Sequence, residues 1–85
     1  MMNFEVGVGD WCYVFGDDVF VQISEIVYDN NKIKHIYATN GVDGIFCDGS
    51  MVWICKKGED PESIFQKLSY DELEKRTIKK LIKVA

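Results

Sequence analysis

The sequence has little cysteine, histidine and proline, and it has no long apolar run. Its 85 residues include three cysteines, one histidine and one proline. An odd number of cysteines without C-x-x-C spacing (Cys12, Cys47 and Cys55) predicts reduced thiols rather than a disulfide framework. Reduced thiols in turn predict a cytoplasmic location. No stretch approaches the roughly 20 apolar residues of a membrane span. The N-terminus also lacks the basic and apolar regions of a signal peptide, so we expect no membrane partner.

Catalytic and metal-binding motifs are missing as well. There is no nucleophile elbow, zinc-protease helix motif or phosphate-binding loop. His35 has no nucleophile or carboxylate beside it in the chain, and we interpret it as a surface or structural histidine. Asn40, Asp43 and Asp48 offer oxygen ligands but not the alternation of a calcium loop, so tight turns account better for them. The sequence therefore predicts no enzyme, no catalytic residue, no cofactor and no metal site.

Basic side chains are scarce in the first two thirds of the chain. Residues 1–55 carry two basic and eight acidic side chains, whereas residues 56–85 carry eight basic and six acidic ones. In the simple interpretation, acidic turns decorate a sheet and basic residues decorate a helix. The alternative is an acidic face that repels or imitates nucleic acid.

Apolar and aromatic residues are plentiful, at 47% and 13% of the chain. That is enough for one domain with its own core. Turns rich in Gly, Asp and Asn separate segments that are typical of strands. In the second segment the alternation breaks near Ser24, which predicts a bulge or a strong bend. The expected strands are residues 11–15, 19–28, 33–39, 45–47 and 51–56, and they predict a mainly β, antiparallel barrel or sandwich.

The period changes to that of helices near the C-terminus. Asp60 can cap a first helix that begins at Pro61 and ends near Leu68. The segment SYDE (69–72) is a capping box, and it predicts a second helix as far as about Ile82. Acidic residues in the first turn and lysines in the last turn of that helix suit its dipole.

The strand segments resemble the small SH3-like barrels of the KOW and Tudor type. The residues that carry this resemblance are VGDWCYVF (8–15), VFVQISEIVY (19–28), KIKHIYATNG (32–41), GIFCDGS (44–50) and MVWICKK (51–57). The chain also resembles short, uncharacterised barrel proteins encoded by phages and mobile elements. The resemblance implies a five-stranded antiparallel SH3-like barrel over residues 1–57. A C-terminal helical extension over residues 58–85 would pack on this barrel within the same single domain.

Such a barrel implies a binding module. KOW-type barrels contact RNA or ribosomal partners, but this function requires a basic stripe that residues 1–55 lack. Tudor-type barrels hold methylated cations in aromatic cages. The resemblance implies that such a cage would use Trp11, Tyr13, Tyr37 and Phe46 with the carboxylate of Asp48. The alternative is that these four aromatic residues belong to the core.

The leading hypothesis is a non-enzymatic protein-protein interaction module that binds a host or self protein, with a homodimer left open. Its acidic and aromatic contact residues would be Trp11, Asp17, Asp18, Phe46 and Asp48. The alternative is a role related to nucleic acid, either as an acidic mimic or by direct contact through the helix. The basic helix face would then comprise Lys75, Arg76, Lys79, Lys80 and Lys83.

Overall fold

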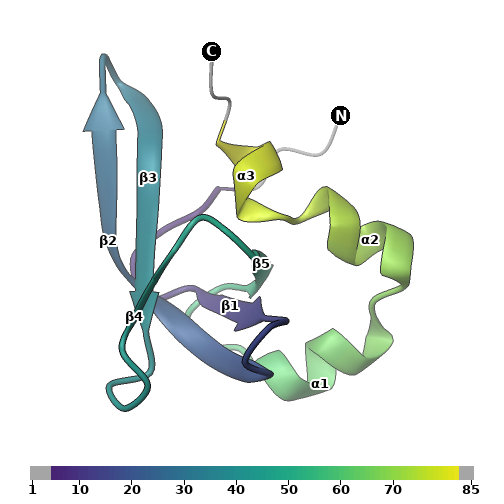
Figure 1. The fold of residues 1–85 in the computed structure, drawn as a ribbon. Coiled ribbons are helices and arrows are strands. Elements are labelled where there is room, and N and C mark those ends of the chain that lie inside the picture. Colours follow the sequence, from purple (N-terminus) through teal and green to yellow (C-terminus); the bar gives the residue numbers. More distant parts are fainter. Residues whose placement is uncertain (1–4, 83–85) are drawn as a thin grey trace.

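The chain forms one open antiparallel sheet with three short helices arranged in an arc along one side (Figure 1). The structure is a computed structural model, and it describes residues 5–82. The elements in chain order are β1 (Trp11–Val14), β2 (Val19–Asp29), β3 (Lys32–Thr39), β4 (Ile45–Cys47), β5 (Met51–Cys55), α1 (Pro61–Lys67), α2 (Tyr70–Lys75) and α3 (Ile78–Leu81). The strand order is β4-β3-β2-β1-β5. The prediction of a mainly β fold with five antiparallel strands is therefore confirmed.

The bulge in β2 lies where the alternation breaks. The register between β2 and β3 shifts between Ile23 and Glu25, so that Ser24 is the extra residue. Before the shift, Val21 and Ile23 are buried. After it, Ile26 packs against the same core cluster, because one additional residue returns its side chain to that face.

The sheet is strongly curled. Strands β4 and β5 occupy its opposite edges, although only residues 48–50 connect them. Four Cα steps, from the last residue of β4 to the first of β5, span at most about 15 Å. A flat sheet would separate its two edge strands by about 19 Å. Because β4 and β5 do not pair with each other, a closed SH3-like barrel stays a prediction.

Buried side chains form two clusters on the two faces of β1 and β5. Cys12 and Val14 of β1 point into the cluster that we call the inner core, while Trp11 and Tyr13 point into an outer cluster beneath the helices. All five residues of β5 are buried, because one cluster lies on each side of it. The inner core comprises Cys12, Val14, Val21, Ile23, Ile36, Ala38, Met51, Trp53, Ile78 and Ile82. The outer cluster comprises Val52, Ile54 and Cys55 with the half-buried Trp11, Tyr13, Phe20, Ile64, Phe65, Leu68 and Leu73.

The starts of the first two helices are as predicted. The Asp60 side chain accepts a hydrogen bond from the Glu62 N–H, and Pro61 follows as the first helical residue. The capping box of Ser69 and Glu72 is present in both directions. None of the helices within residues 5–82 has the length and apolar character needed to cross a lipid bilayer.

The prediction of one continuous second helix is wrong. Helix α2 ends at Lys75 and α3 begins at Ile78, because the two residues between them pair with β5 instead. Thr77 forms a β-bridge with Val52, and the Trp53 N–H donates to the Arg76 carbonyl at 2.9 Å. These bonds cover the outer edge of β5, which would otherwise expose unpaired backbone groups. The break also turns α3 so that Ile78 enters the inner core.

Candidate functional site

The five predicted contact residues do not gather at one place. Trp11 packs in the outer cluster and Phe46 packs against the inner core, and both are half-buried. Asp17 and Asp18 are exposed in the turn between β1 and β2, while Asp48 follows β4 on the other part of the sheet. Trp11 and Phe46 therefore serve packing first, and the acidic turn remains available for contact.

The Tudor-like aromatic cage is not assembled from the expected residues. Tyr13 stacks on Phe65 of α1 with ring centroids 4.3 Å apart. Tyr37 instead pairs across the strands with Cys47, near the end of β4. Side chains alternate between the two faces of a strand, and this separates the aromatics of β1 from Phe46. The structure thus assigns the aromatics of β1 to the core, which was the other interpretation of the sequence.

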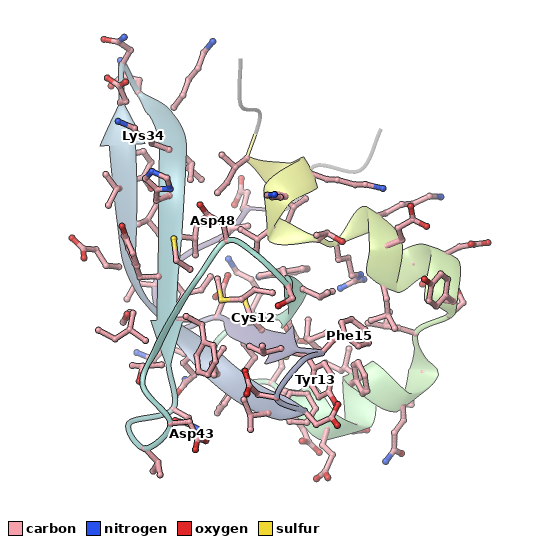
Figure 2. All side chains as sticks on the ribbon, viewed as in Figure 1. Cys12, Tyr13, Phe15, Lys34, Asp43 and Asp48 are labelled. Carbon is pink, nitrogen blue, oxygen red and sulfur yellow. The ribbon has the colours of Figure 1, made fainter. Side chains whose placement is uncertain are left out.

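A groove of about 200 Å³ lies between the end of β1, the start of β5 and helix α2. Two large aromatic side chains line it with much of their surface exposed, Phe15 at 45% and Tyr70 at 79%. Figure 2 shows Phe15 on the side of β1 that faces the helices. The other lining residues are Ser50, Val52, Leu73, Glu74 and Thr77. The sequence does not reveal this groove, because it combines three segments that are distant in the chain.

One acidic residue lines the groove, and two more follow its lining residue Phe15 in the chain. The turn with Asp17 and Asp18 directly follows Phe15, and Glu74 contributes to the groove wall. The Tyr13 hydroxyl donates to Asp18 at 2.7 Å, and this bond, together with burial, raises the pKa of Tyr13. Lys80 binds Glu74 at 2.9 Å, which lowers the pKa of Glu74. The edge of the groove at the β1–β2 turn is therefore negatively charged at neutral pH.

The predicted basic helix face is divided by the break between α2 and α3. Arg76 donates to the Ile54 carbonyl at 2.8 Å and lies 5.3 Å from the centre of the Trp53 ring, so it is committed to the fold. Lys80 forms an ion pair with Glu74, while Lys75 and Lys79 are exposed. Lys83 lies outside the described residues.

Asp10 has a structural role that the sequence did not reveal. Its side chain is buried, with 2% of its surface exposed. It accepts hydrogen bonds from the Gly7 and Lys57 N–H groups, the Trp53 indole and the Lys56 ammonium. Burial raises the pKa of this carboxyl, but the hydrogen bonds outweigh it and hold the pKa below its ordinary value. Asp10 therefore fastens the N-terminal turn to the end of β5 as a carboxylate.

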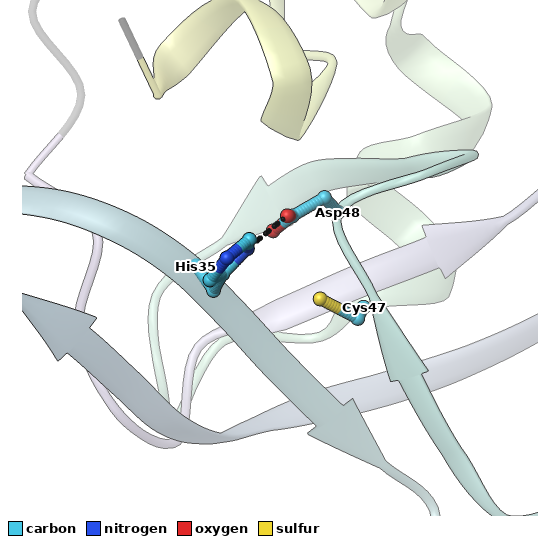
Figure 3. Close-up of side chains that lie close together, drawn as sticks. All are labelled: His35, Cys47 and Asp48. Atoms are coloured by element: carbon cyan, nitrogen blue, oxygen red, sulfur yellow. Dashed lines mark hydrogen bonds and ion pairs between the residues drawn. The ribbon is translucent and has the colours of Figure 1, made fainter. Parts of the chain in front are cut away.

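A second polar cluster joins β3 to the turn after β4 (Figure 3). His35 Nδ1 lies 2.7 Å from Asp48 Oδ2, and the Ile36 N–H donates to Asp48 Oδ1 at 3.0 Å. Donor atoms of His35, Cys47 and Asp48 all lie within 4.8 Å of one another. Asp48 has the left-handed φ of 36°, which is uncommon for a residue other than glycine.

The electrostatics of this cluster keep the Cys47 thiol protonated. Burial, a hydrogen bond to Asp48 and the charge of Asp48 raise the pKa of Cys47, against a smaller opposite effect of the Tyr37 hydroxyl. Burial also raises the pKa of Asp48, but hydrogen bonds from His35, the Ile36 N–H and Cys47 lower it further, for a net decrease. A nucleophilic cysteine requires a lowered pKa. The cluster is therefore not arranged as an activated nucleophile.

The sequence did not indicate that His35 and Cys47 lie beside Asp48. The only available signal was the strand alternation, which places His35 and Tyr37 on one face of β3. The register between β3 and β4 could not be predicted, because it depends on the conformation of the turn at residues 40–44, which the sequence does not specify. In the structure, the pairs Tyr37↔Cys47 and Thr39↔Ile45 set that register.

Comparison with known proteins does not identify the chain: no family model, curated protein or solved structure matches it significantly.

Proposed function

We propose that this protein is a non-enzymatic protein-binding module, built on a small SH3-like barrel, that captures a basic peptide segment of its partner. The single observation that carries this proposal is the groove with Phe15 and Tyr70 beside the acidic turn. Its volume of about 200 Å³ is below the roughly 300–1,000 Å³ of small-molecule pockets. It suits one apolar side chain, and aromatic anchors in pockets of this kind contribute much of the affinity of protein interfaces.

Charge determines the kind of segment that fits. Residues 1–55 carry a net charge of −6, from eight acidic and two basic side chains. Asp17 and Asp18 are exposed and lie in the turn that begins at Phe15, a lining residue of the groove. A lysine or arginine beside the apolar anchor would be attracted by this turn, and complementary charge accelerates association. The closed barrel is part of the proposal, and the three-residue link between the two edge strands supports it.

A random peptide library displayed on phage, selected against the full chain, tests this function. We expect a consensus of one aromatic or aliphatic residue flanked by lysine or arginine. The double variant Asp17→Lys/Asp18→Lys should weaken a synthetic consensus peptide at least tenfold at low salt, because it reverses the charge that attracts the flanking residues. Phe15→Asp should abolish binding. Selection without a consensus, or affinity unchanged in both variants, would contradict the proposal.

Two matched controls accompany this experiment. Val42→Asp introduces the same negative charge as Phe15→Asp, but at a side chain that is 84% exposed and lies outside the groove. It should therefore leave the affinity for the peptide unchanged. A labelled DNA duplex and a labelled single strand, each at low and high salt, test the nucleic-acid alternative. Binding with a steep salt dependence and no peptide consensus would favour direct contact through the lysines.

A further inference from the structure

We propose that His35, Cys47 and Asp48 form a binding site for a divalent transition-metal ion of the zinc class. Figure 3 shows the three side chains, which come from β3, from the end of β4 and from the turn after it, close together. His35 is next to the buried Ile36 in β3, so it lies on the face turned away from the inner core. It offers one nitrogen, one sulfur and one oxygen donor, all within 4.8 Å of one another. Zn²⁺ binds these three kinds of donor at about 2.0–2.3 Å, usually with tetrahedral geometry.

The donors need to move little to reach one ion. In a tetrahedral site with these bond lengths, neighbouring donors are about 3.5 Å apart. His35 Nδ1 and Asp48 Oδ2 are now 2.7 Å apart, because a hydrogen bond holds them together. Binding an ion requires this pair to open by about 0.8 Å and a donor pair at the 4.8 Å limit to close by about 1.3 Å. Side-chain rotation can supply these shifts, since Cys47 is exposed and the His35 side chain is 42% exposed.

The backbone positions all three ligands in advance. The Ile36 N–H occupies Asp48 Oδ1, and the Asp48 N–H donates to the Ile36 carbonyl at 3.3 Å, so Oδ2 is directed toward His35. His35 and Cys47 lie on strands that are paired at Tyr37↔Cys47. Ligands fixed by a sheet lose less conformational freedom on binding than ligands on a mobile loop.

The proton balance of binding is simple. The Cys47 thiol, which is protonated without metal, releases one proton to the solvent as its sulfur coordinates the ion. The protein supplies three ligands, and because Cys47 is exposed and the His35 side chain is 42% exposed, water can take the fourth position.

This site is independent of the groove. None of its three ligands lines that groove, so failure of the peptide experiment would leave the metal proposal unaffected. The competing explanation is a purely structural His35–Asp48 pair that closes the turn between β4 and β5. The two explanations differ in whether Cys47 takes part, because a structural pair does not need the thiol.

The test is titration of the full-length, reduced chain with Co²⁺ and, by calorimetry, with Zn²⁺. We expect one equivalent of each ion to bind and the cobalt complex to show sulfur-to-metal charge-transfer absorption. Cys47→Ser should remove that absorption, and His35→Gln should weaken Zn²⁺ binding at least tenfold, because each loses a ligand. The other two cysteines are poor substitutes, since burial raises the pKa of Cys12 to about 12 and that of Cys55 to about 11.

Asp43→Asn is the matched control, because Asp43 is exposed, bonds only Asn40 at 2.6 Å and lies outside the cluster. It should bind both ions like the unmodified chain. Far-UV circular dichroism of each metal-free variant shows whether the fold is kept. If His35→Gln unfolds, the near-isosteric Cys47→Ser still shows whether the thiol binds the metal ion. Absence of thiolate-to-cobalt absorption in the unmodified chain, or unchanged affinity in Cys47→Ser, would overturn the proposal.

Discussion

At the scale of single residues, two carboxylates connect parts of the chain that are distant in sequence. Asp10 joins the N-terminal turn to Trp53 and to Lys57 beyond β5. Asp48 joins the turn after β4 to His35 in the middle of β3. Both have a pKa below the ordinary value, because the hydrogen bonds to the carboxylate outweigh the effect of burial. Each therefore stabilises the fold in its charged form.

The lowered pKa values predict acid sensitivity. Where the folded pKa lies below the unfolded one, the stabilisation is complete above about pH 4 and is lost as the pH falls through the folded value. Asp10→Asn should reduce the free energy of unfolding at pH 7 by about 2–3 kcal/mol. The amide NH₂ would then face the N–H groups that donate to the carboxylate, and it cannot accept their hydrogen bonds. The variant should also lose less stability than the unmodified chain between pH 4 and pH 2. Urea unfolding followed by tryptophan fluorescence measures both effects.

The exposed Asp17 provides the control for this measurement. Asp17→Asn should change the free energy of unfolding at pH 7 by less than about 0.5 kcal/mol. If Asp10→Asn were as stable as the unmodified chain at pH 7, the buried network would not have the importance assigned to it.

At the scale of elements, the break between α2 and α3 decides what the basic residues can do. The sequence places Arg76 on a helix face with four lysines, whereas the structure ends the helix before Arg76 and turns its side chain over Trp53. The backbone of Arg76 and Thr77 follows β5 instead. The Arg76 carbonyl therefore accepts a hydrogen bond from β5 instead of one from within a continuous helix.

Arg76 should therefore matter for stability, and the neighbouring lysines should not. Arg76→Ala removes a charged hydrogen bond to the Ile54 carbonyl and a cation–π contact, so we expect a loss of about 2–3 kcal/mol. Lys79→Ala, at an exposed position of α3, should cost less than about 0.5 kcal/mol. Thermal and urea unfolding of the two variants make the comparison. Equal stability of both would mean that Arg76 belongs to the solvated face predicted from sequence.

At the scale of the whole molecule, the helices complete the sheet rather than extend from it. Ile78 and Ile82 belong to the inner core, and the side chains of α1 and α2 cover the outer side of β5. A core made from the strands alone would leave Val52 and Ile54 exposed on that side. Sheet and helices should therefore unfold together.

Ile78→Ala tests this cooperation. The side chain is fully buried, so its truncation should cost about 2–5 kcal/mol. Circular dichroism and tryptophan fluorescence should report the same, lowered transition, because a helix that completes the core cannot unfold alone. Val42→Ala, at a position 84% exposed, is the matched truncation and should have little effect. Two separate transitions in Ile78→Ala would indicate that the helices fold as an independent unit.

The features that were predicted correctly are local ones. The strands follow from alternation and turn residues, the bulge at Ser24 from a break in that alternation, and the helix starts at Asp60 and Ser69 from capping chemistry. Each depends on a few neighbouring residues, and the sequence contains all of them. The protein partner and the non-enzymatic function stay predictions.

The sequence by itself determined the number of the strands, their positions in the chain and the first two helix starts, because these depend on local backbone preferences. Only the tertiary structure decided the break at Thr77, the burial of Asp10, the groove at Phe15 and the meeting of His35 with Asp48. These features need contacts between residues that are far apart in the chain. Their physical cause is that buried backbone and polar groups must find hydrogen-bond partners, and those partners are set by the packing of the whole molecule.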